Sequence, residues 1–220
     1  MRRVLRTKWR KKTFLVSGKG KEETMLTTDR YEMRFSGSGG QGIITAAIVL
    51  AEAVATKTKN YVSQTQSYGP EARGGTSKAE IVISGSPIDY PKAIQLDLLL
   101  AMNQASCDAY FADLKADGLL LTDATLVDQV PTDRVVAIPF TQIAVSQAGK
   151  TLVANMAALG AVVHLTQIVS PKAMESALLA RVPKGTEEMN AKAYRAGARA
   201  AKKFDLDKLP PTVTPEDEEV

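Results

Sequence analysis

The strongest chemical signal in this sequence is a glycine-rich segment that reads Gly-Ser-Gly-Gly-Gln-Gly. It follows a short predicted strand, Met33 to Ser36, and precedes a strongly apolar stretch, Ile43 to Lys57, that predicts a helix. Glycines in this context permit a tight turn and let a ligand approach the backbone, and a helix N-terminus favours an anion. The pattern is typical of a dinucleotide-binding loop. The candidate binding residues are Gly37, Ser38, Gly39, Gly40, Gln41 and Gly42.

A dinucleotide site also needs an acidic residue that holds the ribose, about twenty residues after the glycines. The next predicted strand, Asn60 to Ser67, contains no Asp or Glu. Two interpretations therefore stay open. The loop binds a dinucleotide, as in a nicotinamide or flavin enzyme, or its glycines pack a helix against a strand and admit the backbone of a partner.

A second loop, Tyr68 to Gly75, lies between two predicted strands. In a parallel sheet it would lie at the carboxyl edge, close to the first glycine loop. Arg73 could there hold an anion, or it could pair with Glu71 or Glu80 and order the loop. The candidate binding residues of this second loop are Tyr68, Arg73, Gly74 and Gly75.

The scarcity of cysteine and histidine excludes several kinds of site. The chain has one Cys, Cys107, and one His, His164. It therefore cannot form an internal disulfide, and it cannot ligate a whole iron–sulfur cluster or a Cys-rich zinc site. We expect both residues to be core residues, although a helix start could lower the pKa of Cys107. We assign no catalytic residue and no metal ligand, and we expect a reduced, cytoplasmic protein.

Charge is unevenly spread over the 220 residues. Residues 1–34 carry a net charge of +7, residues 205–220 carry −5, and the stretch between them carries only +2. Nucleic-acid binding therefore cannot be argued from the overall charge of +4. We expect a basic, flexible arm over residues 1–30, a domain over residues 31–204 and an acidic tail over residues 205–220.

An uncharged stretch of 21 residues runs from Thr151 to Pro171. It is long enough to span a bilayer, but it contains several polar residues and no basic cluster flanks it. We therefore predict a helix buried in the core or at a subunit interface, and no membrane insertion.

Strands that alternate with helices predict an α/β fold: a three-layer, Rossmann-like, mostly parallel sheet with helices on both faces and a helical C-terminal portion. Besides the elements above, we expect strands at Lys78–Ser84, Leu96–Met102, Leu119–Thr122 and Val135–Pro139, and helices at Gln104–Lys115, Asn155–Ile168, Pro171–Arg181 and Thr186–Phe204.

Several segments resemble the gamma subunit of 2-oxoacid:ferredoxin oxidoreductases, most closely the 2-oxoglutarate branch. Pyruvate, 2-oxoisovalerate and indolepyruvate relatives share the central motifs. The resemblance covers roughly Tyr31 to Phe204. The segments that carry it are Arg34–Gly42, Gln64–Glu80, Ile88–Lys92, Ile138–Thr141, Asn155–Gly160 and Arg181–Thr186.

This resemblance implies a role in the coenzyme A-dependent oxidative decarboxylation of a 2-oxoacid, with ferredoxin as the electron acceptor. In this family the alpha and beta subunits hold thiamine diphosphate and magnesium. The 4Fe-4S clusters lie on the beta subunit and on a ferredoxin-like delta subunit. The expected partners of this chain are therefore those three subunits and ferredoxin, and its two loops would face the active site that the partners form.

Overall fold

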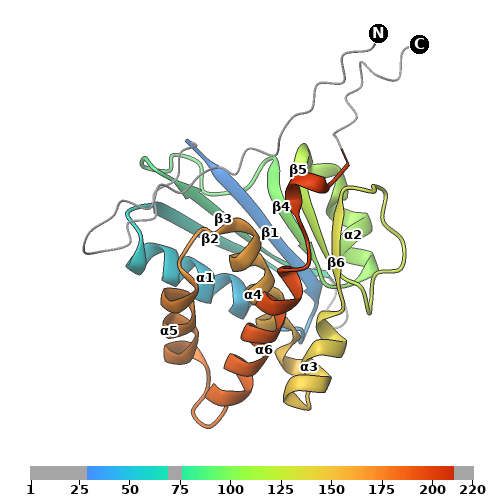
Figure 1. Ribbon diagram of the computed structural model, residues 1–220. Helices are drawn as coiled ribbons and strands as arrows, with labels where there is room; N and C mark the ends of the chain where they lie inside the picture. Colours follow the sequence, from blue (N-terminus) through green and yellow to red (C-terminus); the bar gives the residue numbers. More distant parts are fainter. Residues whose placement is uncertain (1–28, 69–75, 211–220) are drawn as a thin grey trace.

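A six-stranded mixed sheet forms the centre of the computed structural model, which describes residues 29–68 and 76–210 (Figure 1). The strand order is β2-β3-β1-β4-β5-β6. Strands β1, β4, β5 and β6 run parallel, whereas β3 is antiparallel to both of its neighbours. The strands are β1 (Tyr31–Ser38), β2 (Tyr61–Ser67), β3 (Thr76–Ser84), β4 (Leu96–Ala101), β5 (Leu114–Asp123) and β6 (Val135–Ile138).

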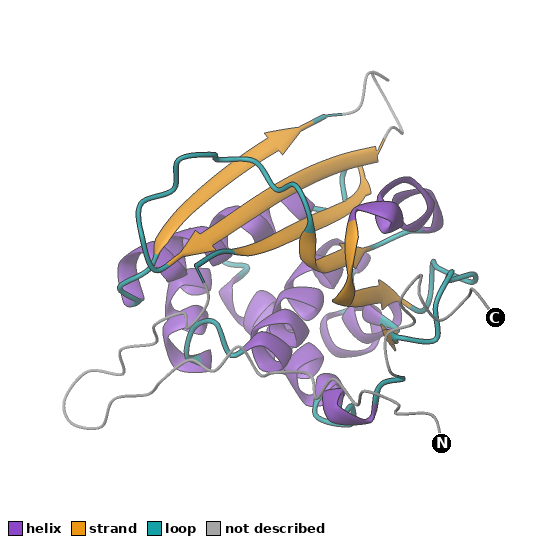
Figure 2. Cartoon of the chain, turned by 90° about the horizontal axis from the view of Figure 1, so that it is seen from above, coloured by secondary structure: helices purple, strands orange, loops and turns teal. Residues whose placement is uncertain are grey.

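Helices cover the two faces of this sheet unequally. Five of the helices lie on one face, and the short α2 packs on the other face together with the loop 85–95 (Figure 2). The predicted α/β fold with helices on both faces is confirmed. The helices are α1 (Ile43–Lys57), α2 (Gln104–Tyr110), α3 (Phe140–Ala148), α4 (Ala154–Thr166), α5 (Pro171–Arg181) and α6 (Glu187–Ala201), with short 3-10 turns at Phe111–Asp113, Thr151–Val153 and Leu206–Lys208.

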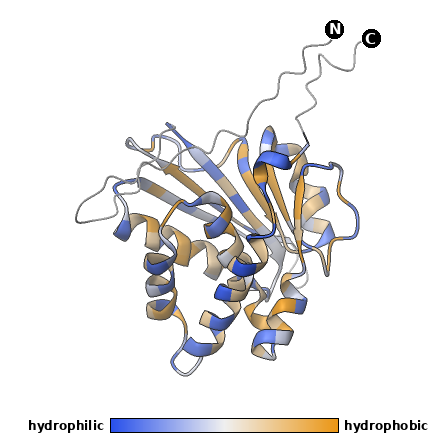
Figure 3. Ribbon diagram, viewed as in Figure 1, coloured by the Kyte–Doolittle hydropathy of each residue, from blue (hydrophilic) through white to orange (hydrophobic). Residues whose placement is uncertain are grey.

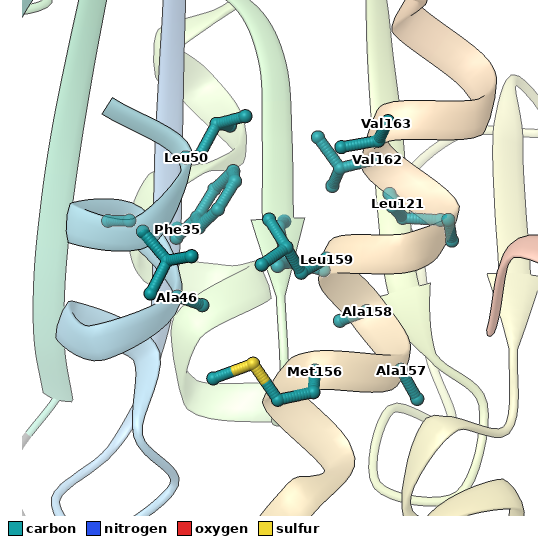
Figure 4. Close-up of a cluster of buried hydrophobic side chains, with 14 of the residues drawn as sticks. Phe35, Ala46, Leu50, Leu121, Met156, Ala157, Ala158, Leu159, Val162 and Val163 are labelled. Atoms are coloured by element: carbon teal, nitrogen blue, oxygen red, sulfur yellow. The ribbon is translucent and has the colours of Figure 1, made fainter. Parts of the chain in front are cut away.

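The uncharged stretch of the sequence forms the centre of the core. Helix α4 is buried on almost every side, because it lies between the sheet, α1, α3 and α6. Leu159 and Val162 of α4 lie in the same apolar cluster as Phe35 of β1, Leu50 of α1 and Leu121 of β5 (Figure 4). The strands β4, β5 and β6 are mostly hydrophobic, while hydrophilic residues lie along the outer sides of α5 and α6 (Figure 3). The prediction of a buried helix is confirmed, and no helix in the described residues is long and apolar enough to cross a membrane.

Two glycines allow α4 and α6 to pack with their backbones in contact. A Cβ atom at Gly160 of α4 would overlap the carbonyl oxygen of Tyr194 in α6. Likewise, a Cβ atom at Gly197 of α6 would overlap the carbonyl oxygen of Ala157 in α4. Any larger residue at either position must therefore push the two helices apart.

The prediction of parallel strands is wrong for β3, whereas β2, which follows β1 and α1, runs parallel to β1 as in a βαβ unit. Strands β2 and β3 form an antiparallel hairpin, in which Tyr61 lies opposite Ser84 and Ser67 lies opposite Lys78. Strand β3 then inserts between β1 and β2, which are parallel to each other but not adjacent. The β1–α1–β2 crossover thus ends two strands away from where it began.

Two further elements differ from the prediction. Helix α2 ends at Tyr110, and β5 begins already at Leu114, where it pairs with Leu96. Helix α3, which begins directly after Pro139, was not predicted, although Phe140, Ile143 and Ala144 have the i, i+3, i+4 spacing of a helix.

Candidate functional site

The first glycine loop lies at the carboxyl end of β1 and leads directly into α1. Gly37 and Ser38 still belong to β1, and the helix begins at Ile43. Gly40 and Gly42 have φ values of 90° and 70°, in the left-handed region that favours glycine. The predicted strand–loop–helix context of the glycines is therefore confirmed.

The side chain of Gln41 fills the inside of this loop. Its Oε1 accepts a hydrogen bond from the backbone N–H of Ser38 at 2.6 Å, and its Nε2 donates to the carbonyl of Met102 at 3.1 Å. A Cβ atom at Gly37 would overlap this same Oε1 atom, which explains why glycine stands there. Because Gln41 already occupies the N–H of Ser38, that group is not available to a bound phosphate.

Two asparagines fix the loop from outside. The Nδ2 atom of Asn155, at the start of α4, donates to the carbonyl of Gly42 at 2.9 Å. Asn103, the N-cap of α2, donates to the hydroxyl of Ser38 and accepts from the N–H of Ser106. The loop is thus held from two distant places in the chain, the start of α4 and the connection between β4 and α2.

Only the tip of the loop is open. A Cβ atom at Gly39 or Gly40 would meet no atom of residues 29–68 and 76–210 within 4 Å, and both glycines are exposed. The first turn of α1, which follows the tip, contains no acidic residue. The site therefore presents a fixed, exposed backbone beside a helix N-terminus, which suits either an anion or the backbone of another protein.

The sheet topology weakens the dinucleotide interpretation. In a dinucleotide fold the second strand lies beside the first and carries the acidic residue that binds the ribose. Here β3 separates β2 from β1, and β2 contains no acidic residue. The ribose-binding part of the fingerprint is therefore missing in both sequence and space.

The second loop ends beside the first. Ser38 lies opposite Thr76, and the hydroxyl of Ser77 donates to the carbonyl of Gly37 at 3.2 Å. The residues that directly follow the second loop therefore lie next to the first loop, because β3 pairs antiparallel with β1. Tyr68 is 68% exposed. Arg73, Gly74 and Gly75 lie outside the described residues.

A buried charge network, which the sequence did not predict, lies on the α2 side of β1 and β3. The guanidinium of Arg34 donates to Oε1 of Glu80 at 2.8 Å and also pairs with Asp113. The Arg34 guanidinium also lies 4.9 Å from the ring centre of Tyr110. Burial works to raise the pKa of Glu80, but the hydrogen bond from Lys78 and the charges of Arg34 and Lys78 outweigh it and lower the pKa.

The remaining titratable candidates have structural roles. Cys107 is fully buried, and burial raises the pKa of its thiol, so it is a core residue and not a reactive thiolate. His164 is partly buried in α4, and its pKa is lowered by burial and by the charge of Lys202. The carboxylate of Asp123 accepts hydrogen bonds from the backbone and hydroxyl of Thr141 at the start of α3. Within residues 29–68 and 76–210, no group of three His, Cys, Asp or Glu residues could hold a metal ion.

Comparison with known proteins identifies the family. Residues 32–200 match the family model described as pyruvate ferredoxin/flavodoxin oxidoreductase. A 2-oxoglutarate synthase subunit KorC from Methanocaldococcus jannaschii is 49% identical over 179 residues, which cover 80% of this chain and 96% of that protein. The common gamma subunit of the pyruvate/ketoisovalerate oxidoreductases of Pyrococcus furiosus is 30% identical, and the match covers 80% of this chain and 99% of that protein.

A solved structure agrees with both matches. The gamma subunit of a keto/oxoacid ferredoxin oxidoreductase from Geobacter sulfurreducens superposes with a TM-score of 0.73 at 45% identity. The match covers 80% of this chain and 98% of that structure. The chain belongs to the pyruvate ferredoxin/flavodoxin oxidoreductase family, among its gamma-type subunits.

Proposed function

We propose that this chain is the gamma subunit of a 2-oxoglutarate:ferredoxin oxidoreductase. The complex oxidatively decarboxylates 2-oxoglutarate, forms the coenzyme A thioester and passes the electrons to ferredoxin. The choice of substrate is supported by the 49% identity with a 2-oxoglutarate synthase subunit, against 30% with a subunit shared by pyruvate and ketoisovalerate enzymes. In this proposal the substrate contacts the other subunits and not this chain.

The partners in this proposal are alpha, beta and delta subunits. The alpha and beta subunits hold thiamine diphosphate and magnesium, and the beta and delta subunits hold the 4Fe-4S clusters. The single cysteine of this chain cannot ligate such a cluster, which fits this division of labour. The same scarcity of cysteine is compatible with a cytoplasmic complex.

The exposed tip of the first glycine loop carries the proposal for the site. Its backbone is fixed by Gln41 and Asn155, and Gly39 and Gly40 face open space. A loop that is so firmly held, yet empty at its tip, is suited to contact a molecule outside the chain. In this proposal the tip and the second loop either shape the entrance for coenzyme A or fix the subunit interface.

Replacing Gly39 by leucine tests this role. A Cβ atom at this position meets no atom of the described residues within 4 Å, so we expect the melting temperature of the isolated chain to stay unchanged. Bulk at an interface should instead weaken assembly, and bulk at the coenzyme A entrance should raise the KM for coenzyme A. Gln147→Leu, at an exposed position of α3, is the matched control. If the Gly39→Leu complex assembles fully and its KM for coenzyme A is unaltered, the first glycine loop is not part of the site.

Arg73 is the residue that we propose to contact a phosphate of coenzyme A. A hydrogen bond to a charged group contributes about 1.5–3 kcal/mol, so Arg73→Ala should raise the apparent KM for coenzyme A roughly 10- to 100-fold while the complex still assembles. An unchanged KM would exclude this role.

Purification of the native chain with its partners tests the whole proposal. The eluate is analysed by mass spectrometry and assayed for coenzyme A-dependent reduction of viologen with 2-oxoglutarate, pyruvate and 2-oxoisovalerate. Thiamine-binding and cluster-bearing partners with 2-oxoglutarate activity are the expected result. A chain that purifies alone and is stabilised against heat by NADH would instead support the dinucleotide interpretation.

A further inference from the structure

Strand β2 is an edge strand whose own sequence lacks the usual protection against pairing. It has β3 on one side and no strand on its other side in the described part of the chain (Figures 1 and 2). Exposed edges are normally protected by charged residues, proline, bulges or very short strands. The seven residues of β2 read Tyr-Val-Ser-Gln-Thr-Gln-Ser and contain neither charge nor proline, and their pairing with β3 has no register shift.

The opposite edge of the same sheet shows the contrast. Strand β6 has only four residues, from Val135 to Ile138, and Pro139 follows it directly. Arg134 precedes it and donates a hydrogen bond to the carbonyl of Pro210, so the C-terminal segment is fastened to the start of this edge. The sheet is therefore protected at β6, whereas the sequence of β2 provides no such protection.

The sequence of β2 is complementary to itself. Residues 63–67 read Ser-Gln-Thr-Gln-Ser, which is the same in both directions about Thr65. If two copies pair antiparallel with Thr65 on the two-fold axis, serine lies opposite serine, glutamine opposite glutamine and threonine opposite threonine. Hydroxyl pairs of this kind stabilise a sheet, and no like charges meet.

Apolar or aromatic residues lie directly before and after residues 63–67. The same pairing places Val62 of one copy opposite Tyr68 of the other, and an aromatic side chain opposite a β-branched one is a favourable cross-strand pair. Tyr68 is 68% exposed in the single chain. Tyr61, at the start of β2, and Tyr90, in the loop beside it, are each 51% exposed. The hydroxyl of Ser63 donates to the carbonyl of Pro91, which places this loop next to β2.

We propose that β2 pairs with β2 of a second copy of this chain, antiparallel and centred on Thr65. The two six-stranded sheets then form one continuous sheet across a two-fold axis. Such an interface is isologous, because each copy contributes the same residues. A complex that contains this subunit is joined to a second complex at this edge.

A cysteine placed on the two-fold axis tests this register. Two cysteines at position 65 would lie directly opposite each other, with Cα atoms about 4.5–5.5 Å apart, which a disulfide can bridge. Ser63→Cys is the matched control, because residue 63 pairs with residue 67 and the two copies of residue 63 lie about 13 Å apart. The one natural cysteine, Cys107, is buried and gives little background.

Mild oxidation of the full chain and of the purified complex should link Thr65→Cys into a dimer at least about fivefold more than Ser63→Cys. A mixture of Ser63→Cys and Ser67→Cys chains should also form a linked dimer. Equal linking of the two single variants, or no linking at position 65 in either preparation, would overturn the proposal.

Sedimentation velocity provides an independent readout. Thr65→Lys places two like charges opposite each other, and it is compatible with the single chain because the Thr65 hydroxyl lies 3.4 Å from Oε2 of Glu80. This variant should weaken the dimer at least about tenfold, whereas Gln147→Lys on α3 should not. A wild-type chain that sediments as a monomer at all concentrations would refute the dimer, and the gamma-subunit proposal would be unaffected.

Discussion

The contact between α4 and α6 predicts a large effect for a single methyl group. Gly197 of α6 faces the carbonyl oxygen of Ala157, and a Cβ atom there would overlap that oxygen. In most helix interiors Gly→Ala is stabilising, because alanine is favoured over glycine by about 1 kcal/mol. At this position the helix preference and the packing therefore act in opposite directions, and their difference can be measured.

The free-energy cost of the overlap is larger than the gain from the helix preference for alanine. Adding a methyl group to a packed core costs roughly 1–3 kcal/mol when neighbouring side chains can move. Here the obstacle is the backbone of α4, which cannot rotate away, so we place the cost at the top of that range. After the helix preference is subtracted, Gly197→Ala should lower the free energy of unfolding by about 2 kcal/mol. For a chain of this size that corresponds to a decrease in Tm of about 4–8 °C.

Thermal and urea unfolding of the purified chain measure this loss. Gly39→Ala is the matched control, because a Cβ atom at Gly39 meets no other atom within 4 Å and the Tm should not fall. Gly160→Ala acts at the same helix contact. The double variant Gly160→Ala/Gly197→Ala should therefore lose less than the sum of the two single losses, because the helices are already separated. A Tm of Gly197→Ala equal to or above that of the wild type would refute the close contact between these helices.

The buried ion pair and the single histidine give two further predictions. Arg34→Met leaves the carboxylates of Glu80 and Asp113 without their shared guanidinium, and urea unfolding should show a loss of about 3 kcal/mol; a loss under about 1 kcal/mol would mean that the network contributes little. Burial and the charge of Lys202 lower the pKa of His164 in the folded chain. When the pH falls below about 6.5, the ordinary pKa of histidine, the unfolded chain therefore binds more protons than the folded chain. Stability is therefore full above this pH and decreases below it, and His164→Gln should reduce the fall in Tm between pH 7.5 and pH 5; parallel profiles for both proteins would contradict this assignment.

Strong local patterns were sufficient to predict most elements. The apolar stretch from Ile43 to Lys57 gave both ends of α1, and Ser170 before Pro171 marked the start of α5, where the Ser170 hydroxyl accepts from the N–H of Ala173. The direction of β3 could not be predicted, because it depends on contacts between residues far apart in the chain. Tyr61 pairs with Ser84, and Tyr31 pairs with Ile83, and no local pattern specifies either pair.

The site was only partly predictable for the same reason. The glycines are visible in the sequence, but the residues that fix their loop are distant. Asn155 follows Gly42 by 113 positions and Met102 follows Gln41 by 61 positions. Asn155 could have been suspected, because the residues directly before and after it, Leu152 to Ala154 and Met156 to Leu159, are all apolar. Polar residues in such a stretch are buried only when they make hydrogen bonds.

The glycine loop shows why the spacing of glycines does not define a ligand. In a dinucleotide site the inside of the turn receives the pyrophosphate, and the backbone N–H groups bind it. Here Gln41 takes that place with its own side chain and bonds to both Ser38 and Met102. The glycines then serve two other purposes: Gly37 makes room for this amide, and Gly39 and Gly40 keep the tip free of side chains. In the proposed role the loop would therefore bind with its outer surface and not with its inside, and a partner subunit or a ligand held by that subunit could reach the exposed tip.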